Sequence, residues 1–166
     1  MKKMLIFSSL FFAGYLGYTQ PSHPHSPHDT VSAKNIKVTY GRPYKKGRTI
    51  FGGLEPYGKV YRCGADEATE ISFAKDGTFG GKPVKAGTYT LCAIPEATKW
   101  TVILNSQLKQ WGAFSYEKYK DKDVLHVDVP VKKLSSPVEQ FTIRIPASEL
   151  VMEWDQTQVA VPVDFK

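Results

Sequence analysis

The residue types best suited to chemistry gather around one stretch of the chain, IFGGLEPYGKVYRCGADEAT, at positions 50–69. The stretch mixes glycines, aromatic residues and charges of both signs. The candidate ligand-binding side chains in and just before it are Arg42, Lys46, Arg48, Tyr57, Arg62 and Glu67. Guanidinium groups bind carboxylate, phosphate or sulfate through paired hydrogen bonds, and glycine lets backbone N–H groups approach a ligand closely. These residues predict a site for an anionic or glycan-like ligand.

Taken alone, the same residues favour a plainer interpretation. Arg62 and Glu67 would pair with each other or cap strand ends, while the glycines supply backbone conformations with positive φ. The phosphate-binding loop and dinucleotide patterns are absent from the sequence, so the pair Gly52–Gly53 is weak evidence of a ligand. We expect no cofactor.

A second cluster of glycine and aromatic residues lies in QWGAFSYEKY, which contains Trp111, Phe114 and Tyr116. Such rings stack on sugars or peptides, but they also fill the open ends of β-sandwiches. We therefore add Trp111 to the candidate ligand-binding residues and leave both interpretations open.

Catalytic patterns are sparse. No GxSxG motif occurs, and His126 is the only histidine outside the N-terminal segment, so a hydroxyl triad has no support. An acid–base hydrolase would use Glu67, with Asp66 or Glu70 as a second carboxylate, although their spacing does not show that they converge.

The histidines His23, His25 and His28 have a spacing that suits copper or zinc, since imidazole binds both metals. Prolines separate them in PSHPHSPHD, and nothing in the sequence orders a surrounding shell of hydrogen bonds. We therefore favour a solvated segment and no metal site.

The N-terminus resembles a secretory signal peptide. Lys2 and Lys3 precede an apolar run over 4–16, which is too short to span a bilayer comfortably. We expect residues 1–19 to be removed before Gln20, leaving no transmembrane segment and an exported protein, periplasmic or extracellular.

Charge and length limit the class of protein. The formal charge is +6, from 22 basic and 16 acidic residues, and it falls to +4 without Lys2 and Lys3. That mild excess is spread along the chain and does not predict nucleic-acid binding. Removing 19 of 166 residues leaves 147, enough for one domain with its own core.

Alternating apolar residues predict eight or nine short strands, for example in NIKVTY, TEISFA, DVLHVDVPV and EQFTIRIP. We expect an all-β fold over 34–166, an antiparallel, jelly-roll-like β-sandwich, after a flexible segment over 20–33. A turn or two of helix could form near 107–111. Positions 41–58 lack strand signals and should form one long ordered loop, rich in glycine and aromatic residues.

Two cysteines, Cys63 and Cys92, lie 29 residues apart, both in predicted strands. A disulfide between them would stabilise the fold by on the order of 3 kcal/mol. The alternative is two buried free thiols that behave as small apolar residues.

These blocks resemble the domain-of-unknown-function family 2911, found in secreted proteins of Bacteroidetes-type bacteria. The likeness is carried by YGRPYKKGRTIFGGLEPYGKVYRCGADEATEISF, AGTYTLCAIP, WTVILN, WGAFSY and DVLHVDV, and covers about 26–163. It implies an all-β domain outside the cytoplasm and brings no established reaction or ligand. Two cysteines that depart together from the family pattern favour a bridge.

The resemblance to the family also favours a functional role for the stretch at positions 50–69. We therefore expect a binding module that uses the loop, with Trp111, to hold its ligand. One alternative is a hydrolase with Glu67 as general acid or base and Arg42 or Arg62 stabilising negative charge. The other is a purely structural domain of the cell envelope.

Overall fold

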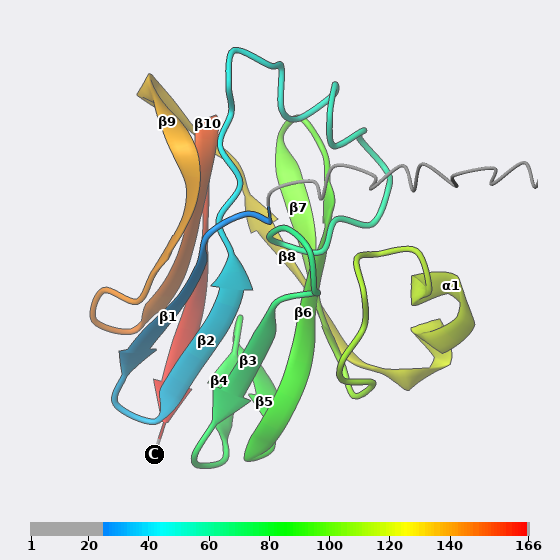
Figure 1. Ribbon diagram of the computed structural model, residues 1–166. Coiled ribbons are helices and arrows are strands. Elements are labelled where there is room, and N and C mark those ends of the chain that lie inside the picture. The colour runs from blue at the N-terminus through cyan, green and yellow to red at the C-terminus, as the bar shows by residue number, and fades with distance from the viewer. Residues whose placement is uncertain (1–24, 166) are drawn as a thin grey trace, which may run out of the picture.

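A computed structural model describes residues 25–165, and it confirms an all-β sandwich of two antiparallel sheets (Figure 1). The larger sheet contains, in spatial order, β1 (His28–Ala33), β2 (Ile36–Gly41), β3 (Glu70–Phe73), β6 (Gly87–Pro95), β7 (Lys99–Asn105) and β8 (Asp123–Pro130). The smaller sheet contains β5 (Lys82–Val84), β4 (Gly77–Phe79), β10 (Glu149–Phe165) and β9 (Lys132–Arg144).

The alternation of side chains along the strands builds the core between the sheets. Ile36, Val38 and Tyr40 of β2 are buried, whereas Lys37 and Thr39 between them are exposed. Strand β8 alternates in the same way. Successive residues of a strand point to opposite faces, so each strand of this kind presents one apolar row to the opposite sheet.

The connection from β2 to β3, residues 42–69, is ordered as expected because its own aromatic residues enter the core. The Phe51 and Trp100 ring centroids lie 4.7 Å apart. Tyr61 is buried and stacks on Trp154 at 6.3 Å. Ile50 is fully buried as well. Burying a large apolar side chain contributes about 1.5–3 kcal/mol, which fixes the loop to the sandwich.

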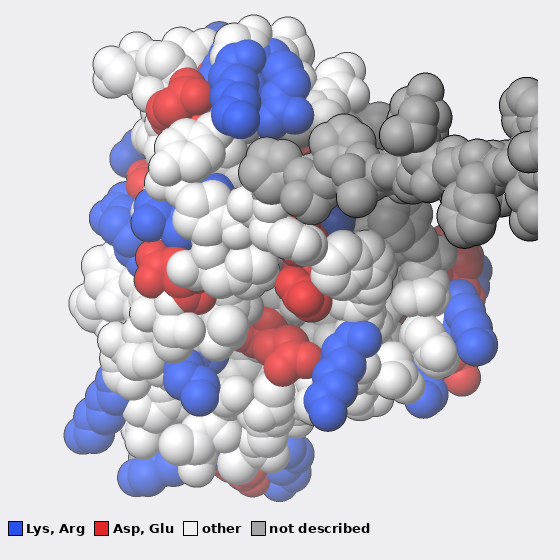
Figure 2. Space-filling view, in the orientation of Figure 1, with Lys and Arg blue, Asp and Glu red and all other residues white. Residues whose placement is uncertain are grey.

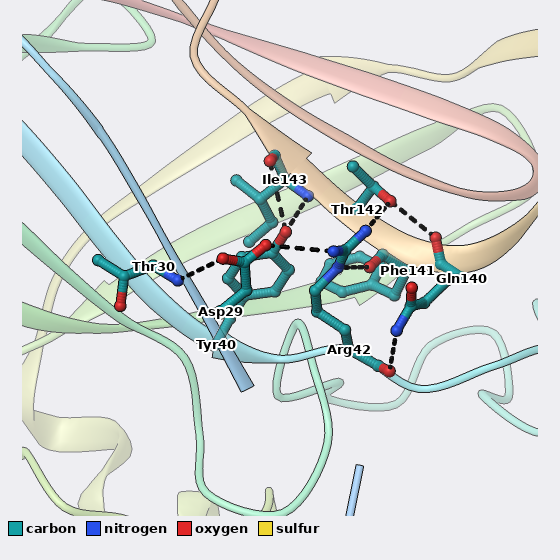
Figure 3. A network of polar contacts seen from close by, with 8 residues as sticks. All are labelled: Asp29, Thr30, Tyr40, Arg42, Gln140, Phe141, Thr142 and Ile143. Atoms are coloured by element: carbon teal, nitrogen blue, oxygen red, sulfur yellow. Dashed lines mark hydrogen bonds and ion pairs between the residues drawn. The ribbon is translucent and has the colours of Figure 1, made fainter. Parts of the chain in front are cut away.

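The end of β2 and the start of this connection join the two sheets along the edge of β9 (Figure 3). The Tyr40 hydroxyl accepts a hydrogen bond from the Ile143 backbone N–H at 3.0 Å. Arg42 donates from Nε to the Phe141 carbonyl oxygen at 3.3 Å and from Nη2 to Thr142 Oγ1 at 3.0 Å. These contacts occupy backbone groups that an edge strand would otherwise leave open.

Arg42 also binds back to the larger sheet. Its Nη1 lies 3.2 Å from Asp29 Oδ2 on β1. Beyond it, the Phe141 N–H donates to the Pro43 carbonyl oxygen at 2.9 Å, and the Lys45 N–H donates to the Glu139 carbonyl oxygen at 2.6 Å. The chain therefore leaves one sheet at Gly41 and pairs with the other within a few residues.

Two boundaries differ from the sequence-based expectation. Strand β1 begins at His28, inside the segment 20–33 expected to be flexible, because it pairs along β2 from His28 opposite Gly41 to Ala33 opposite Ile36. The helix α1 covers Tyr116–Tyr119 rather than 107–111, and a 3₁₀ turn follows at Lys120–Lys122.

The expected signal peptide and His23 lie outside the described residues. No helix within residues 25–165 is long and apolar enough to cross a membrane.

The expected bridge between Cys63 and Cys92 is not formed. Both are buried free thiols, too far apart for a disulfide. Cys63 packs in the main core between the sheets. Cys92 packs in a separate cluster with Ile103 and Tyr116, while its β6 neighbours Leu91 and Ala93 face the main core. The alternation of β6 therefore directs Cys92 to the opposite face of the sheet from Cys63.

We predict that neither thiol reacts with Ellman's reagent in the native protein. Burial raises the pKa of Cys92 to about 12 and that of Cys63 well above its usual value, so almost no reactive thiolate forms at pH 8. Unfolding in denaturant without a reductant should release two reactive thiols. If the unfolded, unreduced chain shows no thiols, a disulfide is present after all.

We predict that Arg42→Met lowers the free energy of unfolding by about 2–3 kcal/mol, because charged hydrogen bonds to both sheets are lost from a partly buried side chain. Arg48→Met is the matched control, since its exposed guanidinium bonds only carbonyl oxygens of its own loop. The control should lose less than about 1 kcal/mol in urea unfolding. Equal losses in the two variants would contradict a role for Arg42 in joining the sheets.

Candidate functional site

Two clefts share the segment 109–116, which follows β7. This segment is held against the β2–β3 connection by backbone pairing. The Ala68 N–H donates to the Gln110 carbonyl oxygen at 2.9 Å, and the Gly112 N–H donates to the Asp66 carbonyl oxygen at 3.0 Å. Glu67 and Trp111 therefore lie opposite each other as an isolated antiparallel bridge. The pairing unites two stretches that the sequence singled out separately.

A glycine brings this assembly close to β2. A Cβ on Gly41 would lie 2.2 Å from the Ala65 carbonyl oxygen, so only glycine lets the two backbones approach in this way. Thr69 adds a hydrogen bond from its hydroxyl to the Cys63 carbonyl oxygen at 2.6 Å. The backbone over 63–69 is thus fixed before any ligand binds.

The first cleft, which we call the Trp111 cleft, has a volume of about 520 Å³. Its lining residues are His28, Thr39, Tyr40, Gly41, Glu67, Ala68, Glu70, Lys109 and Trp111. The Trp111 side chain is 52 % exposed, whereas Trp100 and Trp154 are each 1 % exposed. The His25 ring packs against Trp111 in a T-shaped arrangement, with ring centroids 6.4 Å apart. The cleft therefore combines a half-exposed indole with carboxylates.

Polar contacts orient the acids of the Trp111 cleft. Glu67 Oε2 lies 3.1 Å from His28 Nε2, and the Lys109 backbone N–H donates to Glu70 Oε1 at 3.0 Å. The Glu67 side chain stays 59 % exposed. Figure 2 shows acidic side chains gathered near the middle of this face of the protein. The arrangement offers acceptors for hydrogen bonds from a ligand.

The second cleft, which we call the Glu55 cleft, has a volume of about 370 Å³. Its lining residues are Glu55, Lys59, Val60, Arg62, Ala113, Phe114, Tyr116 and Glu117. Arg62 donates from Nη1 to the Asp66 carbonyl oxygen at 3.0 Å, and its guanidinium carbon lies 5.9 Å from the centre of the Phe114 ring. Phe114 is 83 % exposed. The guanidinium is thus positioned by a backbone oxygen and an aromatic face.

Glu55 is a residue that the sequence analysis missed. The turn around it is closed by the Glu55 N–H bound to the Ile50 carbonyl oxygen and the Gly52 N–H bound to the Glu55 carbonyl oxygen, both at 2.9 Å. Burial raises the pKa of Glu55 to about 7, although the charges of Arg62 and Arg48 act against the rise. Its position in the apolar, glycine-rich run IFGGLEP was the available signal.

The structure distributes the predicted site residues over several places. Glu67 and Trp111 line the Trp111 cleft, and Arg62 lines the Glu55 cleft. Arg42 is bound between the sheets, as described above. Arg42 and Arg62 were the arginines proposed to assist Glu67 in a hydrolase. Neither of them lines the Trp111 cleft, in which Glu67 lies.

The remaining predicted residues lie apart from both clefts. Arg48 donates to the carbonyl oxygens of Lys45 and Tyr44, and the Lys46 backbone N–H donates to Glu139 Oε1 at 2.8 Å. Lys46 and Arg48 line a separate hollow of about 350 Å³. The Tyr57 ring is partly exposed and close to Gly52, where a Cβ would lie 2.8 Å from it.

The three histidines within residues 25–165 lie next to carboxylates. His25 Nδ1 lies 3.6 Å from Asp66 Oδ1, and His28 pairs with Glu67. His126 Nε2 lies 2.8 Å from Asp123 Oδ2 on the exposed side of β8. Over residues 25–165, no group of three His, Cys, Asp or Glu side chains is arranged to hold a metal ion.

The chain belongs to a family of proteins of unknown function, DUF2911, whose family model matches residues 22–163. This confirms the resemblance that the sequence showed. No curated protein matches the chain, and no solved structure does.

We predict that Glu55→Gln removes a pH-dependent loss of stability. A folded pKa near 7 exceeds the unfolded value of 4.5, so the protonated carboxyl favours folding at acid pH, and this advantage is lost as pH rises through 7. In urea unfolding at pH 5, just above the unfolded pKa, the variant should be more stable than the wild type by less than about 1 kcal/mol. At pH 8 it should be more stable, by at most about 3 kcal/mol.

Glu117→Gln is the control for that experiment, because its exposed carboxylate lines the same cleft and pairs with Lys120 at the surface. Its stability relative to the wild type should not change between pH 5 and pH 8. A constant difference for Glu55→Gln at both pH values would contradict the raised pKa.

Proposed function

We propose that this member of DUF2911 is an exported binding module that holds a neutral glycan in the Trp111 cleft. The observation that carries the proposal is a half-exposed indole beside two carboxylates, Glu67 and Glu70, in one cleft. Export is supported by the basic and apolar pattern over 2–16.

The chemistry of the Trp111 cleft suits a polyhydroxylated ring. The flat apolar face of an indole packs against the C–H face of a sugar, and carboxylate oxygens accept hydrogen bonds from neighbouring hydroxyls. A volume of about 520 Å³ lies within the range of ligand pockets in proteins. The backbone pairing of Glu67 with Trp111 holds both groups in place and lowers the entropic cost of binding.

Charge favours a neutral glycan over an anion in this cleft. Glu67 and Glu70 would repel an anionic ligand, and Lys109 is the only lysine or arginine in the lining. The same geometry argues against hydrolysis by Glu67. A general acid near neutral pH requires a carboxyl shielded from water, and the Glu67 side chain is 59 % exposed.

Intrinsic fluorescence offers a direct test of the Trp111 cleft. Trp111 is the only exposed tryptophan of the three, so a ligand that covers it should change the emission through this residue. The probes are neutral cello-, xylo-, manno- and laminari-oligosaccharides, titrated in parallel. We expect at least one series to shift the emission and to bind at least tenfold more weakly to Trp111→Ala, a loss of about 1.4 kcal/mol or more.

Phe114→Ala is the matched control, because it removes an exposed ring from the other cleft. It should leave oligosaccharide binding unchanged. Preferential binding of sulfated or uronic-acid oligosaccharides would replace the neutral glycan with an anionic ligand. Absence of binding to every probe would favour a structural domain of the cell envelope.

A further inference from the structure

The Glu55 cleft is lined by an acidic and a basic side chain, Glu55 and Arg62, that form no ion pair with each other. Burial and the more distant charges of Arg62 and Arg48 act on the Glu55 carboxyl, and no hydrogen bond or ion pair to it is formed within residues 25–165. A partly buried carboxylate without a partner costs free energy, which a cation entering the cleft would recover.

Arg62 lines the same cleft, and most of its N–H donors make no hydrogen bond within residues 25–165. Its Nη1 donates to the Asp66 carbonyl oxygen, and this is the only hydrogen bond of its guanidinium within the described chain. A guanidinium has five N–H donors and binds a carboxylate through two of them. The Phe114 ring makes a cation–π contact with the group, with 5.9 Å between the guanidinium carbon and the ring centre.

We propose that the Glu55 cleft binds a free α-amino acid with an apolar side chain. The ammonium group lies against Glu55, the carboxylate against Arg62, and the side chain against Val60, Ala113 and Phe114. An α-amino acid carries its two charges on adjacent carbons, so it meets the acid and the base of one small cleft together. The proposal concerns a different cleft from the glycan site and does not depend on it.

The surroundings of Glu55 make it the group whose charge changes near neutral pH. Lys59 and Glu117 also line the cleft, and Glu117 pairs with Lys120 at 2.9 Å. The buried Tyr61 and Cys63 lie close enough to feel the charge of Glu55, but burial raises the pKa of both well above the neutral range. The Tyr116 hydroxyl donates to Asp123 Oδ2 at 2.6 Å, and its pKa is raised as well.

Binding of an ammonium group should therefore depend on pH in a defined direction. The ligand requires ionised Glu55, so affinity rises as pH increases through the Glu55 pKa of about 7. Between pH 6 and pH 8 the ionised fraction rises about tenfold, and the association constant should rise by the same factor. A ligand held as a carboxylate by Arg62 and protonated Glu55 would show the opposite trend.

Isothermal titration calorimetry with three related probes tests the proposal on the purified protein. L-Phenylalanine carries both charges, phenethylamine lacks the carboxylate, and 3-phenylpropionate lacks the ammonium group. We expect L-phenylalanine to bind at least tenfold more tightly than either of the others at pH 8. Binding of 3-phenylpropionate that equals it, or no heat from L-phenylalanine up to about 10 mM, would overturn the proposal.

Variants assign the two charges. Glu55→Gln should weaken L-phenylalanine at least tenfold at pH 8 and abolish the pH dependence, while Arg62→Met should reduce its affinity to that of phenethylamine. Glu149→Gln is the control, because its exposed side chain lines neither cleft, and it should leave L-phenylalanine binding unchanged. Thermal unfolding of each variant checks that it is folded. Unchanged binding in a folded Glu55→Gln or Arg62→Met protein would place the amino acid elsewhere and overturn the assignment.

Discussion

The passage of the chain from one sheet to the other at residues 40–45 is the constraint on which the rest of the structure depends. Tyr40 and Arg42 cover backbone groups of β9, and the chain then pairs with the same edge at Lys45. A free edge strand invites pairing with other chains, so this cover both closes the sandwich and protects it. Because Gly41 is the last residue of β2, the closure also determines where the long connection starts.

The path of the connection after Gly41 places the residues that line both clefts. The connection returns over the core at Tyr61, and its end pairs with the segment that contains Trp111. The Asp66 carbonyl oxygen accepts hydrogen bonds from both Arg62 and the Gly112 N–H. A single backbone oxygen thus links the wall of one cleft to the wall of the other. Movement of this turn would affect the two clefts together.

The fold could be predicted from the sequence to a large extent, whereas the grouping of side chains could not. Alternation in NIKVTY and DVLHVDVPV depends only on local spacing, and β2 and β8 follow it. The β9 partners of Arg42 lie about 100 residues away along the chain, and a single sequence cannot show that pairing. Arg42 and Arg62 are therefore indistinguishable by residue type, although one joins the sheets and the other lines a cleft.

The chemistry of Glu55 and the absence of a disulfide also depend on tertiary packing, which local sequence does not show. Glu55 gains its chemistry from burial, which depends on how the loop packs against the core and not on its neighbours in sequence. The number of residues between two cysteines says nothing of which face of a sheet each side chain occupies. Only Cys92 lies in a strand, whereas Cys63, which was also predicted in a strand, lies in the β2–β3 connection with a positive φ of 51°.

The isolation of those thiols sets an order of events during folding. In an oxidising compartment the unfolded chain can close a disulfide between Cys63 and Cys92, but a bridged chain cannot place one sulfur in the core and the other on the far side of β6. If the chain folds in such a compartment, that disulfide has to be reduced or exchanged before the native sandwich can form. In the folded sandwich both thiols are buried, which protects them from oxidants.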